Sequence, residues 1–174
     1  MNRRLMWSVS LFWMLSLASQ AADNLELEFS GVLLVDSCQF ELEGSSQEIR
    51  LPTQKLHSFA RNSRTKSTPF SLGLKGCTPT TQGKTVKLTF NSTQTQQING
   101  IAMLATTGDT GLVLGLEDSV GQAIILGREI QVGTLSQAGP VGVNWFQFGV
   151  YALASGVVKE GSYSATVTVN ADYQ

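Results

Sequence analysis

Apolar and polar residues alternate with a period of two along most of the chain that follows the first 21 residues. This period is typical of β-strands that bury one face, because successive side chains point to opposite sides of a strand. No stretch carries apolar residues at helical spacing over three turns. The alternating runs lie at 25–29, 49–51, 70–74, 86–90, 112–116, 145–151 and 163–173, and a short apolar run lies at 124–126.

Breaks rich in Gly, Pro, Ser and Thr separate these runs, as turns between strands require. The polar segment 56–68 is expected to form a long connection. No change in composition marks a second domain, an internal repeat or a linker. Seven or eight short strands in one domain predict an all-β fold, namely a β-sandwich.

The first 21 residues follow a different pattern. A basic head with Arg3 and Arg4 precedes an apolar run at 5–18, and the small residues Ser19 and Ala21 end the segment. This order is typical of a secretory signal peptide, residues 1–21, that is removed after Ala21. The alternative is a membrane anchor, but the run is shorter than the ~20 residues that span a bilayer. We therefore expect an exported protein.

The charges exclude several classes of function. With 12 Lys and Arg against 13 Asp and Glu, the chain lacks the basic surface of a nucleic-acid-binding protein. Two Cys and one His cannot form a four-ligand zinc site alone, so neither a metal nor a cofactor is expected. Asp109, Glu117 and Asp118 are expected to be solvated turn residues. No catalytic constellation is present, and a secreted β-sandwich enzyme is only a remote alternative.

Export gives the two cysteines a structural role. Cys38 and Cys77 are the only thiols and would meet an oxidising compartment, so they are expected to form a disulfide. In the chain-entropy model, closing such a loop contributes about 4 kcal/mol. A redox or nucleophilic cysteine is the alternative, but there is no CxxC motif and the only histidine, His57, lies in a polar stretch.

The strand pattern begins within a few residues of the predicted cleavage site. Chain ends are usually polar and frayed, so an alternating segment there needs a partner. It could be an ordinary first strand that completes its own sheet. Alternatively, it could pair with another chain by β-strand addition. The pattern alone leaves both interpretations open.

Four features together carry a family resemblance. Phe29, Ser30 and Gly31 stand shortly before Cys38, the strand 69–77 ends in the second cysteine, Gly161 is fourteenth from the C-terminus, and Tyr173 is next to last. With the signal peptide and the cysteine spacing, this sequence resembles the subunits of chaperone–usher pili, the type 1 and P fimbriae of Gram-negative bacteria. The resemblance covers nearly the whole mature chain.

The resemblance implies an incomplete immunoglobulin-like β-sandwich that lacks one strand, which leaves a groove beside the C-terminal strand. In this family a periplasmic chaperone first fills the groove. At an outer-membrane usher, the N-terminal extension of the next subunit then replaces the chaperone strand. The implied organisation is a donor extension at 22–34 and a single pilin domain at 35–174. The implied location is a fimbrium on the cell surface, reached through the periplasm.

The resemblance also implies residue roles. In the donor segment, Leu25, Leu27 and Phe29 would enter pockets of the next subunit, and Gly31 matches a small residue of the motif. Chaperone residues would hold the carboxylate of Gln174. The groove-lining residues would be Gly161, Tyr163, Ala165, Val167, Val169 and Tyr173, of which the two valines are expected to serve the core as well.

The extension before Phe29 is shorter than in shaft pilins, which favours a minor or adaptor subunit. The leading hypothesis is a structural pilus subunit that supports cell adhesion. The alternative is a single-domain adhesive pilin that binds a host glycan or protein receptor. Its binding site would then lie in the segment 56–68 or in a turn between Gly100 and Gly108.

Overall fold

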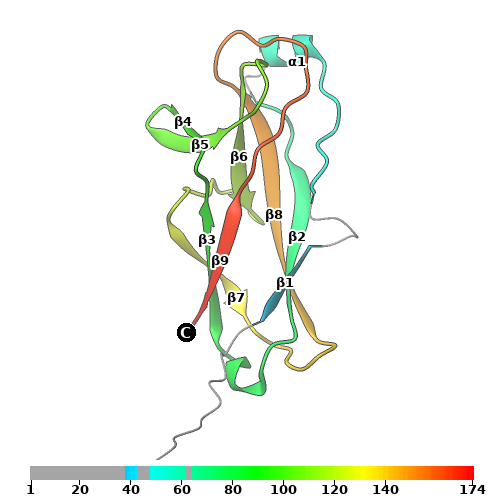
Figure 1. Ribbon diagram of the computed structural model, residues 1–174, viewed down its shortest axis with the longest axis vertical. Helices are drawn as coiled ribbons and strands as arrows, with labels where there is room; N and C mark the ends of the chain where they lie inside the picture. Colours follow the sequence, from blue (N-terminus) through cyan, green and yellow to red (C-terminus); the bar gives the residue numbers. More distant parts are fainter. Residues whose placement is uncertain (1–37, 43–47, 62–63) are drawn as a thin grey trace, which may run out of the picture. The chain divides into compact units, whose positions relative to one another are not determined.

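The computed structural model describes residues 38–42, 48–61 and 64–174, which belong to one compact unit, Val35–Gln174. The predicted signal peptide and the predicted donor residues Leu25, Leu27, Phe29 and Gly31 lie outside the described residues. The elements are β1 (Gln39–Leu42), α1 (Leu56–Arg61), β2 (Thr68–Lys75), the 3₁₀ helix η1 (Pro79–Thr81), β3 (Thr85–Asn91), β4 (Thr95–Ile98), β5 (Ile101–Ala105), β6 (Leu112–Asp118), β7 (Glu129–Thr134), β8 (Val143–Ala154) and β9 (Thr168–Tyr173) (Figure 1).

The strands form two antiparallel sheets. The larger sheet has the order β1-β2-β8-β6-β5-β4, and the smaller one has the order β7-β3-β9. The last strand, β9, therefore stands at an edge of its sheet and pairs only with β3 among the described strands. The alternating runs at 70–74, 86–90, 112–116 and 145–151 are confirmed as β2, β3, β6 and β8.

The core lies between the two sheets and is built from the alternating apolar residues. One face of β3 meets the inward faces of β2, β6 and β8. The ring of Phe148 on β8 lies 5.2 Å from that of Phe90 on β3, edge to face, and 5.6 Å from that of Phe70 on β2. The buried members of the core on these four strands are Leu72, Leu74, Val86, Leu88, Phe90, Leu112, Leu114, Leu116, Phe148, Val150 and Ala152.

The predicted disulfide between Cys38 and Cys77 is confirmed. Cys38 precedes β1 and Cys77 follows β2, so the bond links one end of this strand pair, with the two Cα atoms 4.2 Å apart. Asn144 is buried beside Cys77, and its side-chain oxygen accepts the backbone N–H groups of Ser136 and Gln137, each at 2.9 Å. The covalent link and this buried amide thus fix neighbouring parts of the fold.

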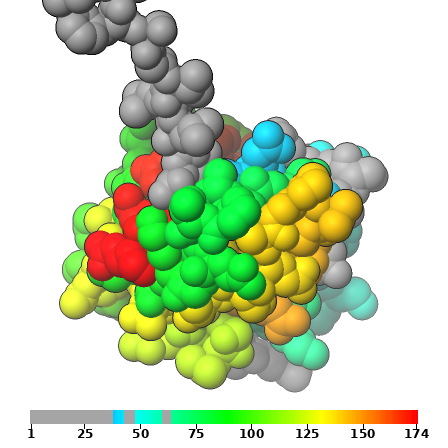
Figure 2. All heavy atoms as spheres, turned by 90° about the horizontal axis from the view of Figure 1, so that it is seen from below, coloured from blue at the N-terminus to red at the C-terminus, as the bar shows by residue number. Residues whose placement is uncertain are grey.

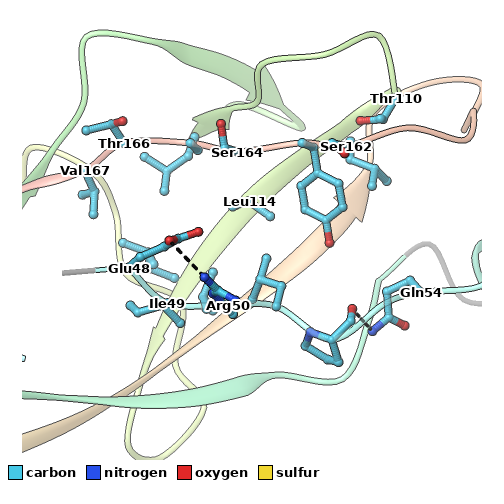
Figure 3. A pocket seen from close by; sticks show the side chains of 18 of the residues that line it. Glu48, Ile49, Arg50, Gln54, Thr110, Leu114, Ser162, Ser164, Thr166 and Val167 are labelled. Carbon is cyan, nitrogen blue, oxygen red and sulfur yellow. Dashed lines mark hydrogen bonds and ion pairs between the residues drawn. The ribbon is translucent and has the colours of Figure 1, made fainter. Parts of the chain in front are cut away.

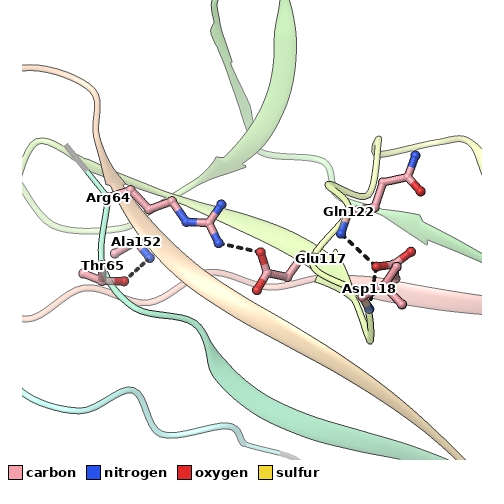
Figure 4. A network of polar contacts seen from close by, with 7 residues as sticks. Arg64, Thr65, Glu117, Asp118, Gln122 and Ala152 are labelled. Carbon is pink, nitrogen blue, oxygen red and sulfur yellow. Dashed lines mark hydrogen bonds and ion pairs between the residues drawn. The ribbon is translucent and has the colours of Figure 1, made fainter. Parts of the chain in front are cut away.

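The prediction for Glu117 is wrong. This residue lies on β6, is buried on the face of the larger sheet that points away from the core, and forms an ion pair with Arg64 (Figure 4). The Arg64 guanidinium also lies 3.7 Å from the ring centroid of Tyr151 on β8. A buried carboxylate requires such a partner. Asp118 does belong to a turn, where its Oδ1 accepts the Gln122 N–H at 2.8 Å.

Two local predictions need correction. The segment 56–68 is not a plain connection, because it contains the six-residue helix α1 and the first residue of β2. The apolar run 124–126 is not a strand: Ile124 is a core residue, but the backbone there forms only an isolated bridge between Glu117 and Ala123. The strand that follows is β7. None of the helices in the described part of the chain is long and apolar enough to cross a membrane.

Gly115 on β6 gives a test of this packing. A Cβ atom there would clash with Cζ of the buried Tyr151, so Gly115→Ala should displace this ring and the Arg64 side chain above it. We expect a loss of about 1–3 kcal/mol in the free energy of unfolding, measured by urea titration. Gly156→Ala is the matched control, because nothing lies within 4 Å of its Cβ position, and it should change stability by less than about 0.5 kcal/mol. Equal effects would contradict the packing.

Candidate functional site

A groove with a volume of 910 Å³ opens beside the C-terminal part of the chain (Figure 3). One wall is the segment 48–54 and the other is the segment 161–169, including the first residues of β9. Core residues from both sheets form the floor between the two walls. The floor residues are Phe70, Leu72, Phe90, Leu104, Leu112, Leu114, Leu116 and Val150. The groove thus lies directly over the hydrophobic core, and of its floor residues only Phe70 is partly buried rather than buried.

The hydrogen-bond register of β9 determines which backbone groups point into the groove. Gln174 and Thr85 exchange two backbone hydrogen bonds, of 2.6 and 3.0 Å. In an antiparallel pair the bonded residues alternate along the strand, so the even-numbered residues of β9 bond to β3. The N–H and C=O groups of Val169, Ala171 and Tyr173 therefore point to the open edge.

The segment before β9 continues this alternation without forming a regular strand. The carbonyl of Ser164 accepts the Thr107 N–H at 2.8 Å, and the carbonyl of Thr166 accepts the Ser92 hydroxyl at 2.9 Å. Both contacts direct these two carbonyl groups away from the groove, although Ser164 and Thr166 also line it (Figure 3). The odd-numbered side chains are partly buried against the core, and they are Tyr163, Ala165, Val167, Val169, Ala171 and Tyr173.

The opposite wall is also extended chain, and in the described part of the chain its residues 49–54 belong to no strand. Ile49 and Leu51 are half-buried against the core, whereas Arg50 between them is exposed. Arg50 and Glu48 form an exposed ion pair on the rim, with 4.0 Å between nitrogen and oxygen. Among the described residues, no backbone hydrogen bond joins this wall to the one at 161–169. In the described structure, the backbone groups of 49–54 and 161–169 therefore do not pair with each other across the groove.

Gly161 closes one end of the second wall. Its φ angle of +151° belongs to a conformation that residues with side chains rarely adopt. A Cβ atom there would also lie 3.2 Å from Cγ2 of the buried Thr110. Glycine is thus the residue that this bend requires. Nearby, Asp109 is solvated, as predicted, and pairs with Lys159.

The two tyrosines of the C-terminal segment differ in position. Tyr163 lines the groove, and burial raises the pKa of its hydroxyl. Tyr173 lies beyond the groove. Its pKa is raised by burial and by the nearby Asp172 charge, whereas a hydrogen bond with the backbone of Cys38 lowers it. Tyr173 thus links β9 to the start of β1, and Figure 2 shows the adjoining C-terminal residues, in red, at the surface.

The structure therefore places five of the six predicted groove residues, Gly161, Tyr163, Ala165, Val167 and Val169, along the groove, and Tyr173 outside it. Sequence reasoning missed the opposite wall, because the alternation of Ile49, Arg50 and Leu51 predicts only a strand. The described residues contain no group of three His, Cys, Asp or Glu side chains that could hold a metal ion.

Comparisons with known proteins identify the fold. The crystal structure of the P pilus rod subunit PapA matches with a TM-score of 0.61 and 21% identity, over 79% of this chain and 99% of that chain. A structure of a chaperone–usher pilus matches with a TM-score of 0.63 and 22% identity, over 88% and 97% of the two chains. These matches confirm the immunoglobulin-like β-sandwich of pilins. Among curated proteins, none matches the sequence.

The family is shown by a family model, described as fimbrial protein, that matches residues 27–174. This match covers most of the chain and confirms the family to which the sequence resemblance points. The location that this family implies is the extracellular pilus. The chain belongs to the fimbrial protein family, and it is a structural subunit of a fimbria.

Proposed function

We propose that the groove between 48–54 and 161–169 accepts a β-strand from another polypeptide, and that this exchange links the subunits of the fimbria. One observation carries the proposal: the groove has an apolar floor and, among the described residues, walls whose backbone groups have no strand partner across it. The half-buried apolar side chains of the walls, such as Ile49, Val167 and Val169, lie next to an open strand edge, which is an aggregation hazard, so a functional occupant is expected. An inserted strand would complete the sandwich.

A suitable occupant must match both the backbone and the floor. Its N–H and C=O groups would pair with those of Val167 and Val169, and alternate apolar side chains would cover Leu112, Leu114 and Leu116. Strand addition of this kind combines main-chain hydrogen bonds with side-chain pockets. Burying each large apolar side chain of the inserted strand contributes about 2 kcal/mol.

The N-terminal segment of this chain has the required pattern. Leu25, Leu27 and Phe29 alternate with the polar residues Glu26 and Glu28, and we propose that they fill the groove of the neighbouring subunit. Gly31 would lie at the small-residue position of the same segment. The residues of this extension belong to 22–34, ahead of the folded unit.

The open groove also implies a companion during export. We propose that residues 1–21 direct the chain to the periplasm and that a periplasmic chaperone occupies the groove there until an outer-membrane usher catalyses the exchange. Without such an occupant, the open edge and the half-buried apolar side chains of the walls would favour aggregation. One of the two similar structures is that of a chaperone–usher pilus, which supports this route.

A donor peptide tests the proposal directly. A peptide of residues 24–33 at 100 times its Kd should stabilise the subunit by about 2.7 kcal/mol, because it binds only the folded state. The melting temperature should rise by about 8 °C in differential scanning calorimetry. The control peptide has Leu25, Leu27 and Phe29 replaced by serine and should leave the melting temperature unchanged. If the native peptide also has no effect, strand addition is excluded.

A charge on the groove wall gives a second test. Val167→Asp would place a carboxylate beneath the inserted strand, which should weaken binding of the 24–33 peptide by about 100-fold or more in calorimetric titration. Thr168→Asp is the matched control, because its exposed side chain lies one residue further along and points away from the core. It should change the Kd by less than about threefold.

Equal weakening by Val167→Asp and Thr168→Asp would contradict the assigned groove, since the two variants carry the same charge. Val167→Thr keeps the shape of the side chain and introduces only a hydroxyl. It should give an intermediate loss of affinity, which separates a local effect on the groove from general unfolding.

A further inference from the structure

The opposite edge of the molecule, strand β4, is also open. It stands at the end of the larger sheet and pairs only with β5 among the described strands. Three of its four residues, Thr95, Gln96 and Gln97, are exposed. Figure 1 shows β4 and β5 as a hairpin away from β9. β5 supplies Leu104 to the groove floor, but no residue of β4 lines the groove, so the open edge of β4 is separate from it.

The register of the hairpin identifies the free backbone groups. Asn99 and Gly100 both have positive φ angles, 52° and 79°, and form a two-residue turn between Ile98 and Ile101. The Ala105 N–H bonds to the Gln94 carbonyl at 3.0 Å, which fixes the alternation of bonded pairs. The N–H and C=O groups of Thr95 and Gln97 therefore point away from β5, to the open edge.

This edge strand is short, with four residues, but it lacks the charges, proline and bulge that normally prevent strand pairing. Exposed edges are usually protected by charged residues, proline or a bulge. From 88 to 108 the sequence contains neither a charged residue nor a proline, and β4 pairs with β5 without a register shift. Ile101 at the tip of the hairpin is 39% exposed. A partner strand would meet no repulsive charge here.

We propose that β4 pairs with β4 of a second copy of this chain, antiparallel across a twofold axis at Gln96. In this register Thr95 of each copy lies opposite Gln97 of the other copy. The backbone groups of these residues point toward the partner strand, so each of the two Thr95–Gln97 pairs can exchange two hydrogen bonds. The two Gln96 side chains then face each other in the non-hydrogen-bonded position. The edge is thus complementary to itself in length, register and charge.

The pairing would join the larger sheets of two subunits into one continuous sheet. Its few bonds make a weak contact between single subunits, but a fimbria presents the edge once in every subunit. Many such weak contacts, formed together along two adjacent fimbriae, would make the association of the two fimbriae stable. The inferred role is lateral association between fimbriae. This pairing does not use the groove at 161–169.

A cysteine at the proposed axis tests the inference on the full mature chain. Opposed residues in the non-hydrogen-bonded position lie ~4.5 Å apart at their Cα atoms, within the range of a disulfide. Gln96→Cys should therefore form a disulfide-linked dimer under mild oxidation, at least about tenfold faster than the control. The control is Gln131→Cys, an exposed glutamine on β7, which is the edge strand of the smaller sheet.

Repulsion at the same edge gives the second measurement. Thr95→Lys combined with Gln97→Lys places lysines opposite each other, so the Gln96→Cys dimer should fall to the level of the Gln131→Cys control. Equal cross-linking of both cysteine variants, or a Gln96→Cys dimer that is insensitive to the lysines, would overturn the inference. Because all variants keep the same groove, association through strand addition affects them equally and is distinguished from pairing through β4.

Discussion

The structure depends on the open backbone edge of the segment 163–173. Its even-numbered residues are bonded to β3, Thr107 and Ser92, so the odd-numbered N–H and C=O groups are left on the open edge, which borders the groove from 163 to 169. Below this edge lies the hydrophobic floor of the sandwich. Unpaired backbone groups beside apolar side chains are a costly combination in water. The fold therefore has one place where another strand would be most stabilising.

The rest of the molecule keeps this place open and well defined. The disulfide between Cys38 and Cys77 links β1 and β2, and Phe90 and Phe148 pack across the two sheets. On the other face of the larger sheet, Arg64 covers Glu117 and Tyr151. These contacts do not involve the groove walls, so a strand could enter the groove without breaking them.

The sequence predicts the parts whose residues alternate strongly. The strands β2, β3, β6 and β8 were predictable because they bury one face in the core. The hairpin of β4 and β5 was missed although Asn99 and Gly100 are a strong turn signal. In β4 the consecutive residues Thr95, Gln96 and Gln97 are all polar, so apolar and polar positions do not alternate there. The wall at 48–54 was not predictable as part of a site, since its role depends on contacts distant in sequence. The pairing of Arg64 with Glu117 joins residues 53 positions apart and has no local signal.

Amide hydrogen exchange tests the central claim most directly, because it reads individual backbone groups along one segment. In the isolated subunit, the amides of Val169 and Ala171 should exchange fast, while those of Thr168 and Asn170, bonded to β3, should be protected. Adding the 24–33 peptide should protect the odd-numbered amides and leave the even-numbered ones unchanged. Odd-numbered amides that are already protected in the isolated subunit would contradict the account.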